Sequence, residues 1–331
     1  MATLKDVAQL ARVSTATVSN VLNGRKRFSA AVEERVWAAA RELGYYRNDS
    51  ARTLRTGQSR TLGLILPDLQ NPFFPALVRN IEHRAREGGY SLLLVDIDNE
   101  EETEREGFHL LARKGVDGVI WVPHRLERPP AVPYPVVAVD RPVPGLDSVF
   151  ADHEEGARQL ARYALQLNHR SIGFLPGPQS LVSARRRREA FLAELQLAGE
   201  SRARIAWEIE TPFDLQLPAA VIPRFTSGEA TLVVAANDIV AIAALELLQA
   251  NGIQVPEEVS VLGFDDIPWA SLVRPRLTTV RQPIGELGRV AVDTLVARID
   301  EPEGATIERV LGVELVTRES AGVRPVLEAA S

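Results

Sequence analysis

Polar side chains that can bind hydroxyl groups follow three apolar segments of the chain. Asp140 and Arg141 come at the end of VVAVD, Asn237 ends TLVVAAN, and Asp265 ends VSVLGFD. A carboxylate accepts hydrogen bonds, a guanidinium donates them in a planar fork, and an amide does both, so such a set can bind paired hydroxyls. These residue types therefore predict a site for a polyhydroxylated small molecule such as a sugar.

Aromatic side chains can supply the apolar wall that the ring of such a ligand needs. Phe213 is the candidate for stacking, Phe73 and Phe74 are candidates for the opposite wall, and Asp68 completes the predicted lining. Each assignment has a simpler alternative. An aromatic residue more often packs in a core, and Asn237 or Asp265 can instead cap the segment that follows it.

Apolar runs rich in Val, Ile and Leu recur from Thr61 onward and alternate with amphipathic stretches. One series comprises TLGLIL, YSLLLVD, DGVIWV and VVAVD, and a second comprises SIGFLPG, RIAWEI, TLVVAAN and VSVLGFD. Runs that are apolar throughout are typical of buried parallel strands, so the pattern predicts an α/β core of two doubly wound parallel-sheet subdomains. Ligands of such folds lie outside the carboxyl ends of the strands, which places the predicted site in the cleft between the halves.

The first sixty residues differ in charge from the rest of the chain. They carry eleven basic and five acidic groups, a net charge of +6, whereas the whole chain carries -6 and the remainder therefore -12. Binding to nucleic acid requires such a basic head, because Lys and Arg displace the counterions condensed on the duplex. On charge alone, a solvated basic surface is the alternative.

Helical patterns in this head fit a DNA-binding unit. A capping-box-like pair, Thr3 and Asp6, precedes an apolar period over 4–11, and further helices are predicted over 15–22 and 30–43. In an all-α helix-turn-helix domain the second helix enters the major groove. The predicted base contacts are Thr15, Ala16 and Asn20, and the predicted phosphate contacts are Thr17, Ser19 and Asn23.

The segment TLKDVAQLARVSTATVSNVLNG resembles the head of the lactose/galactose-repressor family of transcription regulators, and is nearest to its purine-responsive members. WAAARELGYYRNDSARTL resembles the third helix and hinge of that family. LPDLQNPFF, AVDRPVPGLDSV and LTTVRQP resemble its sensing core, which is similar to periplasmic sugar-binding proteins. The resemblance implies a repressor that binds palindromic operator DNA as a homodimer through its core, under the control of a small-molecule effector.

The resemblance also implies how the chain is divided. Residues 1–46 are expected to form the helix-turn-helix domain, 47–59 the hinge helix and linker, and 60–331 the ligand-binding and dimerisation core. In the hinge, Leu54 is the expected minor-groove wedge and Arg55 lies close to the groove or backbone. The expected subdomains are about 60–152 with 283–317, and about 153–281 with 318–331, joined by crossings near Asp152, Arg281 to Gln282, and Thr317 to Glu319.

VSARRR is similar to the sugar-contacting segment of the family's lactose-responsive members, which implies that Ser183 and Arg187 contact hydroxyls. Spacing favours one inward side chain within the run Arg185 to Arg188, whose alternative is a solvated surface. The position that resembles the base-contacting Arg of purine-responsive members is Leu181, which cannot donate a hydrogen bond. A sugar or sugar derivative is therefore the expected effector, and a purine- or nucleoside-responsive repressor is the alternative.

Several other functions are not expected. The sequence has no cysteine and no P-loop, G-x-S-x-G, H-E-x-x-H or G-x-G-x-x-G motif, so no enzyme, cofactor or metal site is predicted. The five histidines lack metal-ligand spacing and are expected on the surface or in the core. No signal peptide or membrane span is predicted, which favours a cytoplasmic protein. A sugar-binding protein with no DNA role is a further alternative, but it does not need the basic head.

Overall fold

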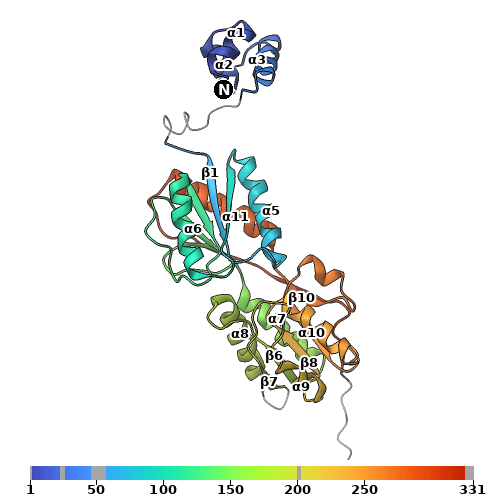
Figure 1. Cartoon of the computed structure of the whole chain (residues 1–331). Coiled ribbons are helices and arrows are strands. Elements are labelled where there is room, and N and C mark those ends of the chain that lie inside the picture. Colours follow the sequence, from blue (N-terminus) through green and yellow to red (C-terminus); the bar gives the residue numbers. More distant parts are fainter. Residues whose placement is uncertain (1, 23–26, 46–56, 200–202, 325–331) are drawn as a thin grey trace, which may run out of the picture. The chain divides into compact units, whose positions relative to one another are not determined.

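The computed structural model describes residues 2–22, 27–45, 57–199 and 203–324. The chain divides into two compact units, Met1–Ser59 and Arg60–Ser331. The first unit is helical and the second is a larger α/β core (Figure 1).

The first unit contains the three helices that the sequence predicts. These are α1 (Leu4–Ala11), α2 (Thr15–Leu22) and α3 (Ala30–Glu42). The capping box is confirmed, because the Thr3 hydroxyl accepts from the Asp6 N–H at 3.4 Å and the Asp6 carboxylate accepts from the Thr3 N–H at 2.7 Å. One fully buried valine from each helix, Val7, Val18 and Val36, meets the others in a small common core. The helices therefore form one packed unit, as the helix-turn-helix prediction requires.

The core contains two six-stranded sheets. The first has the order β11-β5-β4-β3-β1-β2 and the second the order β12-β10-β9-β8-β6-β7. The strands of the first sheet are β1 (Thr61–Leu66), β2 (Ser91–Asp96), β3 (Gly118–Trp121), β4 (Val136–Val139), β5 (Asp147–Ala151) and β11 (Glu308–Leu311). The strands of the second are β6 (Ser171–Leu175), β7 (Arg204–Glu208), β8 (Leu232–Ala235), β9 (Ser260–Asp265), β10 (Thr278–Arg281) and β12 (Glu314–Val316). All pairs are parallel except β10 with β12, so the predicted doubly wound fold class is confirmed.

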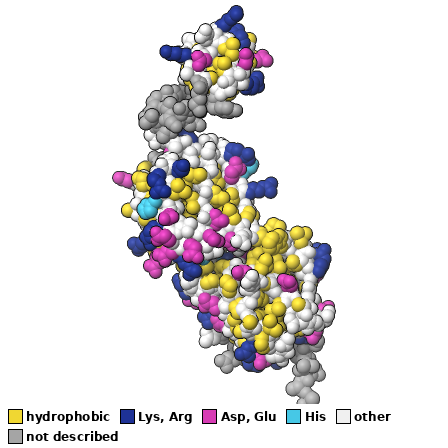
Figure 2. Space-filling model, in the orientation of Figure 1, with side chains coloured by type: hydrophobic (Ala, Val, Ile, Leu, Met, Phe, Trp, Pro, Cys, Tyr) yellow, Lys and Arg dark blue, Asp and Glu magenta, His cyan; other side chains and the backbone are white. Residues whose placement is uncertain are grey.

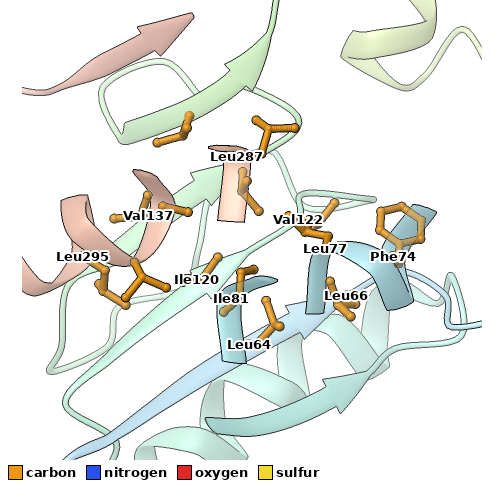
Figure 3. Packing of buried hydrophobic residues seen from close by; sticks show 14 of the residues in the cluster. Leu64, Leu66, Phe74, Leu77, Ile81, Ile120, Val122, Val137, Leu287 and Leu295 are labelled. Carbon is orange, nitrogen blue, oxygen red and sulfur yellow. The ribbon is translucent and has the colours of Figure 1, made fainter. Parts of the chain in front are cut away.

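Helices cover the sheets of both halves (Figure 1). The first half has α5 (Phe73–Glu87), α6 (Glu101–Lys114) and α11 (Ile284–Asp300). The second has α7 (His153–Gln166), α8 (Val182–Ala198), α9 (Val221–Thr226), α10 (Asp238–Ala250) and the short helix η1 (Pro268–Ser271). Figure 3 shows how Leu77 of α5 and Leu287 of α11 pack with Leu64 of β1, and all three are fully buried. This packing fixes the N-terminal turn of α5, which reaches the site described below.

The chain crosses between the halves at three places. It crosses after β5 at Asp152, after β10 at Gln282, and between β11 and β12 at Gly312. The third crossing differs from the expected position at Thr317 to Glu319, because Val316 already pairs with Thr279 in the second sheet. The segment ERVLGVELV resembles one continuous strand, so its division between two sheets depends on distant partners that local sequence does not show. The expected first-half segment 283–317 therefore ends too late.

Candidate functional site

A cleft of about 410 Å³ lies between the two halves of the core. Its walls come from the first half through Pro67, Asp68, Gln70, Asn71, Phe74, Asp98, Asn99, His124, Arg125 and Arg141, and from the second through Pro178, Leu181, Pro212, Phe213, Asp214, Leu215, Ile239 and Trp269. The first wall is mostly polar and the second mostly apolar. This volume is within the range of small-molecule sites, and the carboxyl ends of β1, β4 and β6 open toward it.

A smaller cavity of about 20 Å³ shares Asn71, Phe74, Arg141 and Phe213 with the cleft. Its full lining is Asn71, Phe73, Phe74, Asp140, Arg141, Ser183, Arg187, Phe213, Asn237, Asp265 and Gln282. The structure thus brings nine of the ten predicted effector residues around one cavity, and the tenth, Asp68, lines the adjoining cleft.

Arg187 is the inward member of its arginine run. It is 7% exposed, whereas the next residue, Arg188, pairs with Glu208 on the surface. The Arg187 Nη1 donates to the Ala236 carbonyl at 2.7 Å, and its guanidinium carbon lies 3.7 Å from the centre of the Phe264 ring. Its Nη2 lies 3.4 Å from Asp265 Oδ1. Stacking and hydrogen bonding together fix the plane of this guanidinium inside the second half.

Asp265 is a buried carboxyl, and different parts of its surroundings shift its pKa in opposite directions. Burial raises its pKa to about 6, and the nearby Arg187 and a hydrogen bond from Gln282 act in the opposite direction. Gln282 Nε2 donates to Asp265 Oδ1 at 2.7 Å. At neutral pH the group is therefore an ionised acceptor with Gln282 and Arg187 as neighbours.

Asp140 and Arg141 form the corresponding pair on the first half. Arg141 Nε lies 3.4 Å from Asp140 Oδ2, and its Nη1 donates to the Pro123 carbonyl at 2.6 Å. Burial raises the pKa of Asp140, and Arg141 partly offsets this effect. Asp140 Oδ1 and Gln282 Oε1 are buried without a hydrogen-bond partner in the part of the chain that the structure describes. Because such groups are costly to leave unpaired, hydroxyls of a bound ligand would satisfy both.

The backbone is strained at the two aspartates. Asp140 has φ 68° and Asp265 has φ 119°, both in the left-handed region that side chains other than glycine rarely adopt. Asp140 follows β4 and Asp265 ends β9, and both residues line the inner cavity. Strain of this kind concentrates at binding sites, which supports a ligand role for the pair.

Asn237 and the three predicted phenylalanines line the cavity and also make structural contacts. Asn237 Oδ1 accepts from the Val240 N–H at 2.9 Å, so the residue caps α10 while it also lines the cavity. Phe213 lies against Gly177, where a Cβ would be 2.1 Å from a carbon of the ring. Phe73 and Phe74 pack edge to face with centroids 5.3 Å apart, and both are buried. Packing therefore fixes all three rings at the cavity wall.

Sequence reasoning missed several lining residues. Asn71 and Gln282 belong to LPDLQNPFF and LTTVRQP, segments that already carried the family resemblance, so their amides were available as candidates. His124, Arg125 and Trp269 line the outer cleft, and nothing in their local sequence pattern marks them.

The predicted DNA contacts lie on α2. Thr15 and Ala16 are exposed and Asn20 is partly exposed, as residues that meet base edges need to be. The Thr17 hydroxyl lies 2.9 Å from the Ser14 hydroxyl, so part of its hydrogen-bonding capacity is used within the helix start. Ser19 is partly exposed. The other predicted contacts, Asn23, Leu54 and Arg55, lie outside the described residues.

Comparison with known proteins connects both units to one family. Residues 3–48 match the model of bacterial regulatory proteins of the lacI family, and residues 161–321 match the periplasmic binding protein-like domain. The ribose operon repressor of Escherichia coli K12 is 34% identical over 91% of this chain and 94% of its own length. The chain belongs to the lacI family. It is therefore a DNA-binding regulator with a small-molecule-binding core.

Further members of the lacI family show similar sequences and folds. The transcriptional repressor PurR of Aliivibrio salmonicida is 30% identical over 97% of this chain and 99% of its own length. The lac repressor dimer bound to operator and the anti-inducer ONPF has a TM-score of 0.82 at 28% identity, covering 97% and 99% of the two chains. A lacI-family regulator from Enterococcus faecium with bound ribose has a TM-score of 0.69 at 28% identity, covering 80% and 100%.

Two further findings concern the described residues alone. None of their helices is both long and apolar enough to cross a membrane. They also contain no group of three or more His, Asp or Glu side chains that is arranged to hold a metal ion.

Proposed function

We propose that this lacI-family protein is a repressor that binds palindromic operator DNA and releases it when a neutral sugar binds in the core. The observation that carries the proposal is the convergence of carboxylates, guanidinium groups, amides and phenylalanines from both halves on one cavity. These are the groups that bind sugar hydroxyls and the apolar face of a sugar ring. A regulator of chromosomal genes acts in the cytoplasm, where the DNA is.

The charges of the site favour a neutral ligand over a phosphorylated one. In the inner cavity, two carboxylates, Asp140 and Asp265, face two guanidinium groups, Arg141 and Arg187. The outer cleft adds Asp68, Asp98 and Asp214 against Arg125. Because the cationic groups already have anionic neighbours, a phosphate would meet more negative than positive charge. A neutral sugar derivative avoids this repulsion.

A purine effector has less support. Leu181, at the position where purine-responsive relatives are expected to have a base-contacting Arg, is 3% exposed and forms part of the apolar wall of the cleft. Leucine offers no donor to the edge of a base. The inner cavity instead presents acceptors and donors suited to several hydroxyls.

Thermal unfolding of the full chain tests the effector class. We expect one or more neutral sugars, from a panel of D-ribose, D-xylose, D-glucose and D-galactose, to raise the midpoint, since saturation at a hundred times Kd adds about 2.7 kcal/mol. The matching sugar phosphates, adenine, guanine and adenosine serve as the comparison. A midpoint that responds only to the purines or only to the phosphates would overturn the neutral-sugar proposal.

Effector affinity should depend on pH through Asp265. Its pKa is raised to about 6. As pH falls below this value the carboxyl becomes neutral, loses an acceptor for hydroxyls and no longer pairs with Arg187. We expect binding of the active sugar to be about tenfold weaker at about pH 5 than at about pH 7.5. Calorimetric titration of Asp265→Asn should give weak and pH-independent binding, and an unaltered pH profile in that variant would refute the assignment.

A homodimer is the proposed assembly. One helix-turn-helix head buries too little surface for tight specific binding, so two heads must read a two-fold symmetric site. The core offers exposed apolar residues for association: Leu94 on the edge strand β2 is 37% exposed, and Leu272 after η1 is 69% exposed. Apolar side chains also gather on the visible face of the second half (Figure 2). Exposed apolar surface of this kind marks interfaces.

Charge placed on these leucines should separate the protomers. We expect Leu94→Lys with Leu272→Asp to convert the dimer to a monomer, because each change buries an unpaired charge in the proposed interface. Light scattering after gel filtration measures the mass. Leu197→Lys, at an 84% exposed leucine near the end of α8, is the matched control and should leave the dimer intact. A double variant that stays dimeric would exclude this surface.

A further inference from the structure

His153 is a buried histidine between the two charged pairs of the cavity. It is the first residue of α7, directly after the crossing at Asp152, and it is 1% exposed. Its Nε2 lies 2.7 Å from the main-chain oxygen of Asp140 in the first half. Its Nδ1 lies 3.3 Å from both Nε and Nη2 of Arg187 in the second half. One imidazole thus joins a residue from each half.

The partners of the ring select one protonation state. A carbonyl oxygen only accepts and a guanidinium only donates, so Nε2 must carry the hydrogen and Nδ1 must be the acceptor. A second hydrogen on Nδ1 would point at the Arg187 guanidinium. Burial and the charge of Arg187 lower the pKa of His153 well below its ordinary value, which agrees with a neutral ring. The ring is therefore a fixed donor on one side and a fixed acceptor on the other.

The same contacts determine how Arg187 can lie. Its Nη1 donates to the Ala236 carbonyl and its face stacks on Phe264, and these contacts hold the Nη1 end and the plane of the guanidinium. His153 Nδ1 is the acceptor on the opposite edge, where it faces Nε and Nη2 together. A hydrogen bond that orients a binding group in this way acts as an outer-shell partner.

We propose that His153 is the positioning residue of the effector site, which orients the Arg187 guanidinium from the start of α7 and links it to the backbone of Asp140. The effect of His153 on sugar binding rests on the function proposed above, whereas the orientation of Arg187 is a property of the free protein. Because His153 bonds Arg187 with one ring nitrogen and the main chain of Asp140 with the other, the sugar meets a preformed donor.

Three variants separate positioning from packing. His153→Asn can keep an acceptor near the place of Nδ1 and loses the Nε2 donor. His153→Phe keeps a ring of similar shape and loses both hydrogen bonds. His169→Phe is the matched control, because His169 is another 1% exposed histidine, bonded to Thr231 and Gly322 far along the chain from Arg187.

NMR of the full chain labelled with ¹⁵N-Arg and ¹⁵N-His tests the orientation without any sugar. We expect a His153 ring protonated at Nε2 alone, and an Arg187 Nε–H that exchanges slowly. Exchange should become about tenfold faster in His153→Phe, stay slow in His153→Asn and be unaltered in His169→Phe. The other tautomer, or an Arg187 exchange rate that His153→Phe leaves unaltered, would overturn the proposal.

Titration with D-ribose then tests the effect on binding. His153→Phe should weaken binding about tenfold and His153→Asn less, while His153→Phe added to Arg187→Lys should weaken it by less than about twofold further. Fully additive losses would show that His153 acts independently of Arg187 and would overturn the positioning role. If the wild-type chain bound none of the panel sugars, the proposed effector class would fail, and the NMR result would still decide the orientation.

Discussion

Replacing Arg187 with methionine is expected to weaken effector binding by about a hundredfold, because the change removes a planar donor and leaves Asp265 buried without its cationic neighbour. Arg187 is 7% exposed and lies 3.4 Å from Asp265, so water cannot readily take its place. The sugar should then no longer release operator DNA at concentrations that release the wild-type protein. Calorimetric titration and operator-binding assays with the active sugar measure the two effects.

Arg188→Met is the matched control for this experiment. Arg188 is the next residue along α8, but its guanidinium pairs with Glu208 at the surface. Exposed pairs contribute little to stability, so this variant should bind sugar and operator as the wild type does. Equal sugar affinities in Arg187→Met and Arg188→Met would contradict the site.

Replacing Glu104 with alanine should lower the free energy of unfolding of the core by about 4 kcal/mol. Glu104 is fully buried on α6, and its carboxylate accepts from the indole N–H of Trp121 at 2.8 Å. It also accepts from the backbone N–H groups of His124, Arg125 and Leu126, each at 2.9 Å. Removal of the carboxylate leaves these donors without a partner. Urea unfolding followed by the intrinsic fluorescence of the four tryptophans and by circular dichroism measures the loss.

The Glu104 bonds also hold the segment that lines the outer cleft through His124 and Arg125. Loss of sugar affinity should therefore accompany the loss of stability in Glu104→Ala. Glu102→Ala, an exposed glutamate two residues earlier on the same helix, is the control and should alter stability by less than about 0.5 kcal/mol. A Glu104→Ala variant as stable as this control would show that water satisfies the freed donors.

The sequence predicted the fold class and the grouping of the candidate site for physical reasons. Continuous apolar runs such as TLGLIL and VSVLGFD mark buried parallel strands, and the ends of such strands meet at one edge of a sheet. Asp140 follows β4 and Asp265 ends β9, and the two residues meet at one cavity for this reason. In the head, the positions of Val7 and Val18 indicated which faces of the short helices pack together.

Residues whose role depends on distant partners were not predicted. Glu104 belongs to the acidic run EETERE, which locally resembles a solvated helix face, and only the loop that follows β3 makes it a buried acceptor. His153 was expected to be an ordinary surface or core histidine, because its partners Asp140 and Arg187 are far away in sequence. The third crossing was misplaced for the same reason, since β12 is assigned by its pairing with β10.

The cavity explains how a ligand can act on the arrangement of the core. Arg141 and Asp140 come from the first half, and Arg187 and Asp265 from the second. A sugar that bonds both pairs binds best when the halves hold one relative position, and so favours that position over others. Coupling of this kind, transmitted to the two heads of a dimer, would change operator affinity.

Selection of operator DNA by the full chain tests whether the protein is a sugar-controlled, operator-binding dimer. The protein is used to enrich sites from a random duplex library, and the enriched site is then titrated with and without the active sugar by fluorescence anisotropy. We expect a two-fold symmetric site whose Kd rises at least about tenfold with sugar in the wild type and does not rise in Arg187→Met. Enrichment of no symmetric site, or a Kd that no sugar in the panel alters, would contradict it.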